Sequence, residues 1–150
     1  MAVVGPGEAS PEEEGQAEEV GRLLAQAGAT LVSGGLGGVM GAACRGASGG
    51  GGLTVGLLPG SDRAAASPHV SVAIPTGLGE LRNGLVVRAA DALIAVGGAG
   101  RSPGTLSEIA LALKSGKPVI GLDTWEIEGV EHADSPQAAV ERALTVGGPT

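Results

Sequence analysis

Short apolar runs alternate along the chain with stretches of helical periodicity. The apolar runs predict strands at residues 2–4, 29–33, 53–58, 70–74, 92–96 and 118–122. The periodic stretches predict helices from Pro11 to Gly28, from Val39 into the glycine run at 49–52, and at 78–90, 105–115 and 135–144. Strands that alternate with helices are typical of an α/β fold built on a parallel sheet. We therefore expect one parallel sheet covered by helices.

The first helix carries the clearest boundary signals. Ser10 is a good N-cap, Pro11 suits the first helical position, and Glu12 to Glu14 lie where the helix dipole favours anions. Ser10 and Glu13 also have the spacing of a capping box. We expect the apolar stripe of this helix to face the sheet.

The composition fits such a fold and removes several classes of function. The 150 residues include 29 Gly, one Trp and no Phe or Tyr, so the core must consist of Val, Leu, Ile and Ala. The length predicts a single domain over residues 1–150. A formal charge of -7 argues against binding to nucleic acid or to an anionic membrane, since both require a basic surface.

Cysteine usage and the amino-terminal residues give further expectations. Cys44 is the only cysteine, which excludes an internal disulfide, and the absence of a Cys/His cluster predicts no metal site. Residues 1–10 lack the basic region of a signal peptide, and no apolar run is long enough to span a bilayer. We expect a cytoplasmic protein.

Three turns that follow predicted strands are rich in glycine, at residues 5–10, 34–41 and 97–105. In an open parallel sheet, ligands bind at the carboxyl ends of the strands, where free N–H groups of helix starts attract anions. None of these turns has the dinucleotide fingerprint or the GxxxxGK[ST] phosphate loop. Because all three turns lie at the same edge of the predicted sheet, they favour binding of a phosphorylated small molecule, although each turn alone could be purely structural.

Two of these turns resemble motifs of the Lonely Guy (LOG) family, whose members were long mislabelled as lysine decarboxylases. Residues 33–41, SGGLGGVMG, look like its GGGxxGxMG segment. Residues 96–98 and 104–108, VGG and GTLSE, look like its PGGxGTxxE motif. The resemblance covers nearly the whole chain in the same order. It implies a Rossmann-like three-layer sandwich with a mostly parallel sheet of about six or seven strands, and a site for a nucleotide 5′-monophosphate.

The resemblance also implies candidate site residues. In cytokinin-activating members, an Arg and the Glu of the second motif hydrolyse an N-glycosidic bond, and the matching residues here are Arg82 and Glu108. An Arg can orient a phosphate, while a carboxylate can activate water or stabilise an oxocarbenium centre. The implied ligand-binding residues are Gly7, Ser33, Gly34, Gly35, Gly37, Gly38, Met40, Gly97, Gly98, Gly104 and Thr105.

Several departures from the hydrolase pattern favour a different branch of the family. Asn83 stands where the family has Lys, Val96 replaces Pro, and residues 99–103 replace a single residue. The chain more closely resembles a sister branch of nucleotide-binding proteins and molybdenum-cofactor carrier proteins. The expected function is therefore binding of a phosphorylated nucleotide or pterin, with no required cofactor and with a nucleotide monophosphate or molybdenum cofactor as the bound ligand. The alternatives are a nucleoside 5′-monophosphate phosphoribohydrolase and a structural subunit that binds nothing.

Simpler interpretations remain for individual residues. Thr105 and Glu108 have capping-box spacing, and Arg82 and Arg88 could be solvated cations. We expect residues 100–103 to form a mobile loop that narrows the phosphate turn, with Arg101 adding a positive charge. Ser102 and Pro103 could instead start the helix upstream of Thr105.

The resemblance implies a homo-oligomer, a dimer or a tetramer. The chain offers an apolar surface for such pairing at Leu78, Leu85 and Val86.

Overall fold

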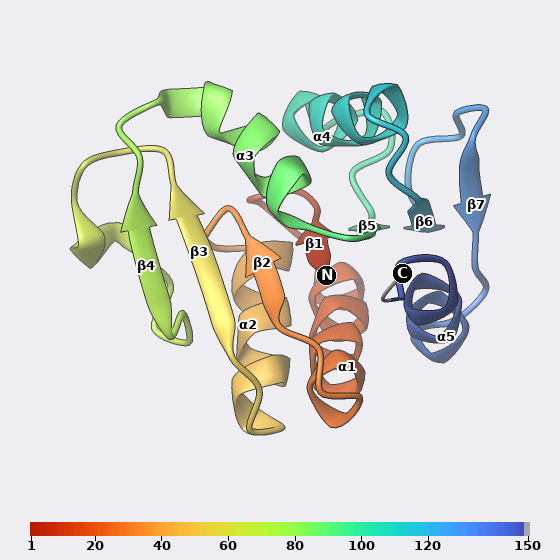
Figure 1. Ribbon diagram of the computed structural model, residues 1–150, viewed down its shortest axis with the longest axis horizontal. Coiled ribbons are helices and arrows are strands. Elements are labelled where there is room, and N and C mark those ends of the chain that lie inside the picture. Colours follow the sequence, from red (N-terminus) through yellow and green to blue (C-terminus); the bar gives the residue numbers. More distant parts are fainter. Residues whose placement is uncertain (149–150) are drawn as a thin grey trace.

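The computed structural model describes residues 1–148, which form a seven-stranded sheet with helices on both faces (Figure 1). All neighbouring strands are parallel, in the order β4-β3-β2-β1-β5-β6-β7. The strands are β1 (Ala2–Val4), β2 (Leu31–Ser33), β3 (Thr54–Leu58), β4 (Val72–Pro75), β5 (Leu93–Val96), β6 (Val119–Leu122) and β7 (Val130–His132). The predicted α/β Rossmann-like sandwich is confirmed.

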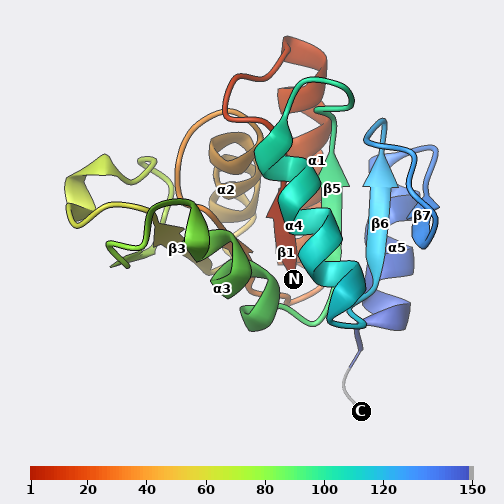
Figure 2. The same ribbon diagram turned by 90° about the horizontal axis from the view of Figure 1, so that it is seen from above.

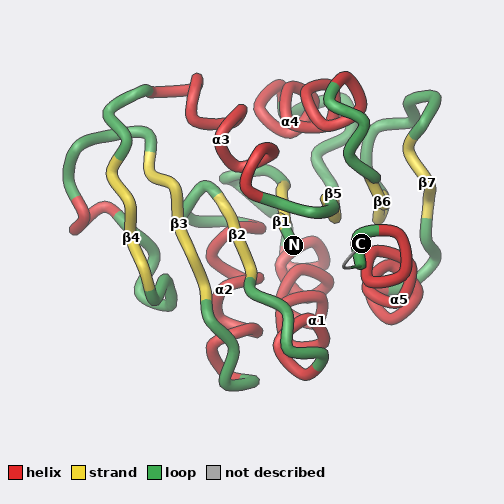
Figure 3. Tube along the Cα trace, viewed as in Figure 1, coloured by secondary structure: helices red, strands yellow, loops and turns green. Residues whose placement is uncertain are grey.

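Five α-helices divide between the two faces. Helices α1 (Pro11–Gln26), α2 (Val39–Gly49) and α5 (Pro136–Val146) cover one face, while α3 (Arg82–Ala89) and α4 (Pro103–Lys114) cover the other (Figure 1). Figure 2 shows α3 and α4 lying next to each other on their face. Two short 3-10 helices, η1 (Arg63–Ala65) and η2 (Gly79–Leu81), belong to the longer connections between strands (Figure 3). Each face carries its own aliphatic core.

The strand order sets the position of a crevice. The chain runs outward from β1 to β4, then returns to place β5 on the other side of β1, with Ala2 opposite both Val32 and Leu93. Such a reversal opens a crevice at the carboxyl ends of the two central strands. The turns that follow β1, β2 and β5, which are the three glycine-rich turns, therefore meet at one place.

Helices α1 and α2 approach each other almost backbone to backbone. A Cβ atom on Gly21 would lie 2.0 Å from the carbonyl oxygen of Ala43, and one on Gly46 would lie 1.9 Å from that of Glu18. No side chain fits at either position. Burial of Ala17, Val20 and Leu24 confirms that the stripe of the first helix faces inward.

The sequence placed some boundaries incorrectly. The helix predicted at 78–90 starts as a 3-10 turn and becomes an α-helix only at Arg82. Leu81 is 75% exposed, whereas Val86 is fully buried and takes no part in the apolar surface expected there. Strand β7 was missed because Val130, Glu131 and His132 form a partly polar edge strand without an apolar run.

We predict that Gly46→Ala destabilises the protein by about 2 kcal/mol or more, because the helices must separate to admit one methyl group. Urea denaturation measures this loss. Gly15→Ala is the control, since Gly15 lies in α1 with no atom within 4 Å of its Cβ position. The control should be neutral or stabilising, because Ala has the higher helix propensity. Equal stability of the two variants would contradict the close approach.

Candidate functional site

A pocket of about 290 Å³ lies in the crevice at the carboxyl ends of the central strands. We call it the switch-point pocket. It brings the predicted residues Arg82 and Glu108 together with Gly7, Met40, Gly104 and Thr105. Its other lining residues are Gly5, Pro59, Glu80, Asn83 and Ser102. Residues from four separate connections therefore converge on one cavity.

The remaining predicted residues lie outside this lining and support the turns instead. A Cβ on Gly34 would lie 2.8 Å from Cζ of Arg82, so this glycine makes room for the guanidinium. A Cβ on Gly38 would lie 2.3 Å from the carbonyl oxygen of Pro6. Ser33 accepts a hydrogen bond from the Gly35 N–H at 3.1 Å. Gly35, Gly37, Gly97 and Gly98 are likewise absent from the pocket lining.

Arg82 presents a buried positive charge with unused donors. Its residue is 8% exposed, and its Nη1 donates to Oδ1 of Asn83 at 2.5 Å. Its Nε is buried and has no hydrogen-bond partner in the described chain. Burial lowers the pKa of Arg82, and the nearby Glu108 opposes that shift. An arginine stays charged at neutral pH nonetheless, so the guanidinium lacks an anion.

Glu108 lies in α4 and lines the same pocket. Burial raises the pKa of Glu108 to about 8, although Arg82 acts to lower it. Within residues 1–148, no ion pair joins the two side chains. At pH 7 the carboxyl group is therefore mostly neutral and can donate a hydrogen bond, which a carboxylate cannot do.

The start of α4 corrects two expectations. Ser102 caps the helix, its Oγ accepting from the Thr105 N–H at 3.4 Å, so Thr105 and Glu108 form no capping box. The Leu106 N–H donates to the Ser102 carbonyl oxygen at 3.1 Å. These two N–H groups are therefore not free for a ligand. The helix starts at Pro103 because Ser102 and Pro103 are the better starting pair.

Helix α2 has no side-chain cap at its amino-terminal end, where the Val39 N–H donates to the Pro6 carbonyl oxygen at 3.1 Å and the Met40 N–H has no hydrogen-bond partner among residues 1–148. Its N-cap is Gly38, which supplies no side chain, and no side-chain hydrogen bond caps the helix. Met40, in its first turn, lines the pocket. The partial positive charge of a helix start is thus available beside Arg82.

Arg101 does not supply its charge to the pocket, contrary to expectation. It forms an ion pair with Glu13, and its Nη1 donates to the Glu8 carbonyl oxygen at 2.9 Å. Arg101 lines a neighbouring hollow with Gly98 and Asp123 instead. The sequence offered only one signal for Glu13, its capping-box spacing with Ser10.

Asn83 is a further residue whose role the sequence did not show. Its Nδ2 donates to Oγ of Ser107 at 3.1 Å, and that hydroxyl donates to the Gly104 carbonyl oxygen at 2.7 Å. Together with the Arg82 contact, this chain of bonds joins α3 to the first turn of α4. Asn83 therefore fixes the guanidinium relative to Gly104.

Other sequence features take no part in this site. Cys44 is fully buried, and burial raises the pKa of its thiol. Among residues 1–148, no group of three or more His, Cys, Asp or Glu side chains is arranged to hold a metal ion. None of the described helices has the length and apolar character needed to cross a bilayer.

Comparisons with known proteins extend over nearly the whole chain. The sequence model of the SLOG cluster4 family matches residues 1–147. An uncharacterized protein from Archaeoglobus fulgidus is 41% identical over 146 residues, covering 97% of this chain and 94% of that protein.

Two solved structures are similar in both sequence and fold. The molybdenum cofactor binding protein from the phototrophic bacterium Rippkaea orientalis is 39% identical, with a TM-score of 0.90 over 97% of this chain and 94% of that one. The molybdenum cofactor carrier protein from Chlamydomonas reinhardtii is 34% identical, with a TM-score of 0.86 over 97% and 96%.

We predict that Glu108→Gln makes the protein more stable in alkaline solution. The folded-state pKa of about 8 exceeds the ordinary 4.5, so folding favours the proton, and Glu108 costs stability progressively as the pH rises from 4.5 to 8. Glutamine removes this cost, which is roughly 3–5 kcal/mol at pH 9, and changes little at pH 4. Urea denaturation at both pH values measures the difference. An equal effect at pH 4 and pH 9 would contradict a neutral Glu108.

Proposed function

The chain belongs to the SLOG cluster4 family, and from this premise we propose that it binds a phosphorylated pterin or nucleotide and holds it without cleaving it. The molybdenum cofactor is the ligand that the similar solved proteins favour, since one is a molybdenum cofactor binding protein and the other a molybdenum cofactor carrier protein. The proposal is therefore a carrier-like role.

One observation carries this proposal: the buried Arg82 guanidinium has no counter-charge. Burying a cation without a partner is costly, and Glu108, its neighbour, is mostly neutral at pH 7. A phosphate entering the pocket supplies the missing negative charge.

Each lining group has a defined part in the proposed complex. Arg82 pairs with the phosphate, and the open amino-terminal end of α2 stabilises the same negative charge. Glu108 donates a hydrogen bond to a ligand oxygen. Gly7 and Gly104 have no atom within 4 Å of their Cβ positions, so their backbones leave open space for a ligand. A volume of about 290 Å³ suits a phosphate with part of one ring.

Hydrolysis of a nucleoside monophosphate is the second candidate, because Arg82 and Glu108 line one pocket. A glutamate that activates water or stabilises an oxocarbenium centre must be ionised. The pKa of about 8 leaves Glu108 mostly neutral at pH 7, so it can fill neither of these two roles until the pH rises. Any hydrolysis through this carboxylate should rise with pH until it is ionised.

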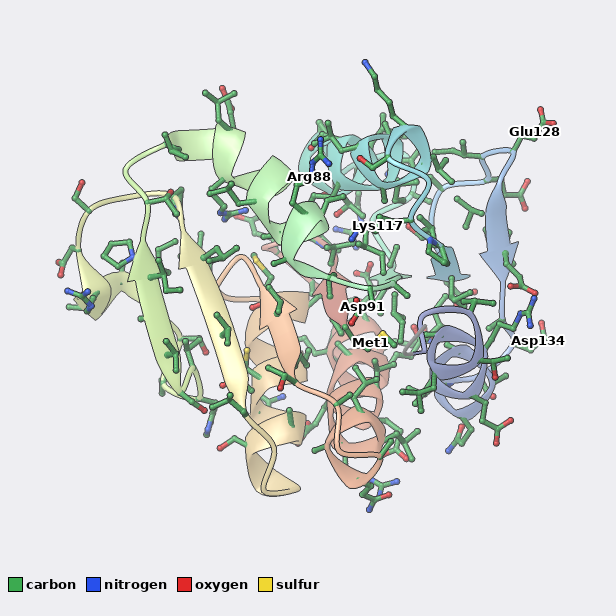
Figure 4. All side chains as sticks on the ribbon, in the orientation of Figure 1. Met1, Arg88, Asp91, Lys117, Glu128 and Asp134 are labelled. Carbon is green, nitrogen blue, oxygen red and sulfur yellow. The ribbon has the colours of Figure 1, made fainter. Side chains whose placement is uncertain are left out.

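We predict that Arg82→Gln weakens binding of AMP, used as the phosphate probe, by about tenfold or more, the scale of a lost charged hydrogen bond. Isothermal titration calorimetry measures the affinity. Arg88→Gln is the matched control: it removes the same charge from the same helix, but Arg88 is exposed and absent from the pocket lining (Figure 4). Glu108→Gln should keep its affinity, because the amide also donates.

Further measurements on wild type and these variants distinguish the carrier from the hydrolase and from the structural subunit. Native mass spectrometry of freshly purified wild type should show a bound phosphorylated ligand. Release of free base from AMP or isopentenyladenine riboside monophosphate, abolished by Glu108→Gln, would establish the hydrolase instead. Wild type that carries no ligand and does not bind AMP would favour the structural subunit.

We further propose that the chain forms a homo-oligomer through the face of α3 and α4. Large exposed apolar side chains gather there, on α3, α4, the turn before α3 and the edge strand β4: Leu78, Leu81, Leu85, Leu111, Val72 and Ile74. A groove between α3 and α4, lined by Leu81 and Leu111, crosses this face. Several large apolar side chains exposed on one side of a protein are typical of an interface. A second copy of the chain is the occupant we propose.

Light scattering should therefore give about two or four times the chain mass of 14.4 kDa. Leu81→Asp should shift this mass towards the monomer, because it places a charge in the interface. Ala138→Asp is the control, since Ala138 is exposed on α5, which covers the opposite face of the sheet. A monomeric wild type would refute the proposal.

A further inference from the structure

One carboxylate joins the two turns on either side of the central strands. Oε1 of Glu13 accepts the Ser10 N–H at 2.9 Å, and its Oε2 accepts the Gly98 N–H at 2.9 Å. Arg101 forms the ion pair described above with the same group. The donors thus come from the turn after β1 and the turn after β5, which are about 90 residues apart in the sequence.

We propose that the Glu13 carboxylate is a built-in anion: it fills the amino-terminal end of α1 and positions the turn at residues 97–104 for ligand binding. This inference rests on the proposed function for its ligand. Glu13 itself is a positioning residue, because it lines the hollow beside Arg101 and is absent from the lining of the switch-point pocket.

The surroundings of Glu13 are built for a negative charge. Its side chain is 12% exposed. Burial alone raises the pKa of Glu13, but the hydrogen bonds from Ser10 and Gly98, together with Arg101, lower it below the ordinary value. Backbone N–H groups at a helix start are the same donors that bind ligand phosphates in other parallel sheets. Here the chain supplies the anion itself.

Gly97 is shaped to this carboxylate. Its φ angle is +68°, and a Cβ atom there would lie 1.8 Å from Oε2 of Glu13. The turn thus leaves space at this point for the carboxylate and for no side chain. Neither the positive φ angle of Gly97 nor the space left for the carboxylate would be needed if Glu13 served only to cap its own helix.

The contacts of Glu13 set the width of the pocket. Gly5 and Gly7, on one wall, belong to the turn that includes Ser10. Ser102, Gly104 and Thr105, on the facing wall, follow directly from Gly98 and Arg101. Without the carboxylate, the two turns lose their shared acceptor and the walls are free to separate.

The test compares Glu13→Ala with Glu12→Ala, which removes an exposed carboxylate from the same helical turn. Binding of inorganic phosphate is measured well below the melting temperature of each variant. We expect Glu13→Ala to lose about tenfold in affinity, whereas Glu12→Ala stays within about twofold of wild type. Glu13→Gln keeps the shape of the side chain, and it replaces Glu13→Ala if that variant does not fold.

Chemical rescue then tests the anion itself. Formate fits the space that Glu13→Ala leaves, so it should raise the melting temperature of that variant in a saturable manner, beyond sodium chloride at equal ionic strength. The amide NMR signal of Gly98 should move in Glu13→Ala and return with formate. Glu12→Ala and wild type should show neither effect.

Two results would overturn the proposal: wild-type phosphate affinity in Glu13→Ala, or the same response to formate and chloride. Failure of the proposed function would look different. Wild type would then bind neither phosphate nor AMP, while the formate rescue and the Gly98 signal would still report on Glu13.

Discussion

The fold depends on segments of backbone that approach each other more closely than side chains allow. Helix α1 meets α2 at Gly21 and Gly46, and the turn after β1 meets the start of α2 at Gly38. Arg82 fits against the backbone at Gly34 for the same reason. A core without aromatic rings suits such packing, because Val, Leu, Ile and Ala side chains fill the narrow spaces between closely packed backbone segments. The high glycine content therefore serves the packing of the fold first and the candidate site second.

The two buried glutamates Glu13 and Glu108 show how the environment of a carboxyl group sets its pKa. Glu13 is surrounded by donors, and its pKa lies below the ordinary value. Glu108 lacks such donors, and burial moves its pKa to about 8. Hydrogen-bond donors around a carboxyl group stabilise its charged form, and the group then holds the surrounding structure in place. A buried carboxyl group without such donors stays neutral and is available to a ligand. The same residue type thus serves a positioning role at Glu13 and the proposed contact at Glu108.

Much of the fold follows from local sequence, and the site only partly does. The apolar runs located six strands, of which β1, β2, β5 and β6 are buried on both faces, and Ser10, Pro11 and Glu13 marked the start of α1 correctly. The convergence of Arg82 and Glu108 on one pocket was expected only from motif resemblance. The partner of Arg101 could not be read from the sequence, since its contact with Glu13 spans 88 residues and depends on the strand order. The burial of Val86 escaped prediction because the first turn of the segment is a 3-10 turn, which changes which residues of α3 face the core.

The place of β1 in the sheet has a consequence for how the chain acquires its structure. This strand is central, yet its second neighbour, β5, begins at Leu93. On a ribosome, roughly 60 further residues must follow β2 before β5 exists, which takes several seconds at about 5–20 residues per second. During that interval one edge of β1 stays unpaired, and the aliphatic layer meant for α4 is open to water. Parallel sheets with such distant pairings fold slowly and are prone to aggregate before closure. The second edge of β1 therefore gains its neighbour only once β5 has been synthesised.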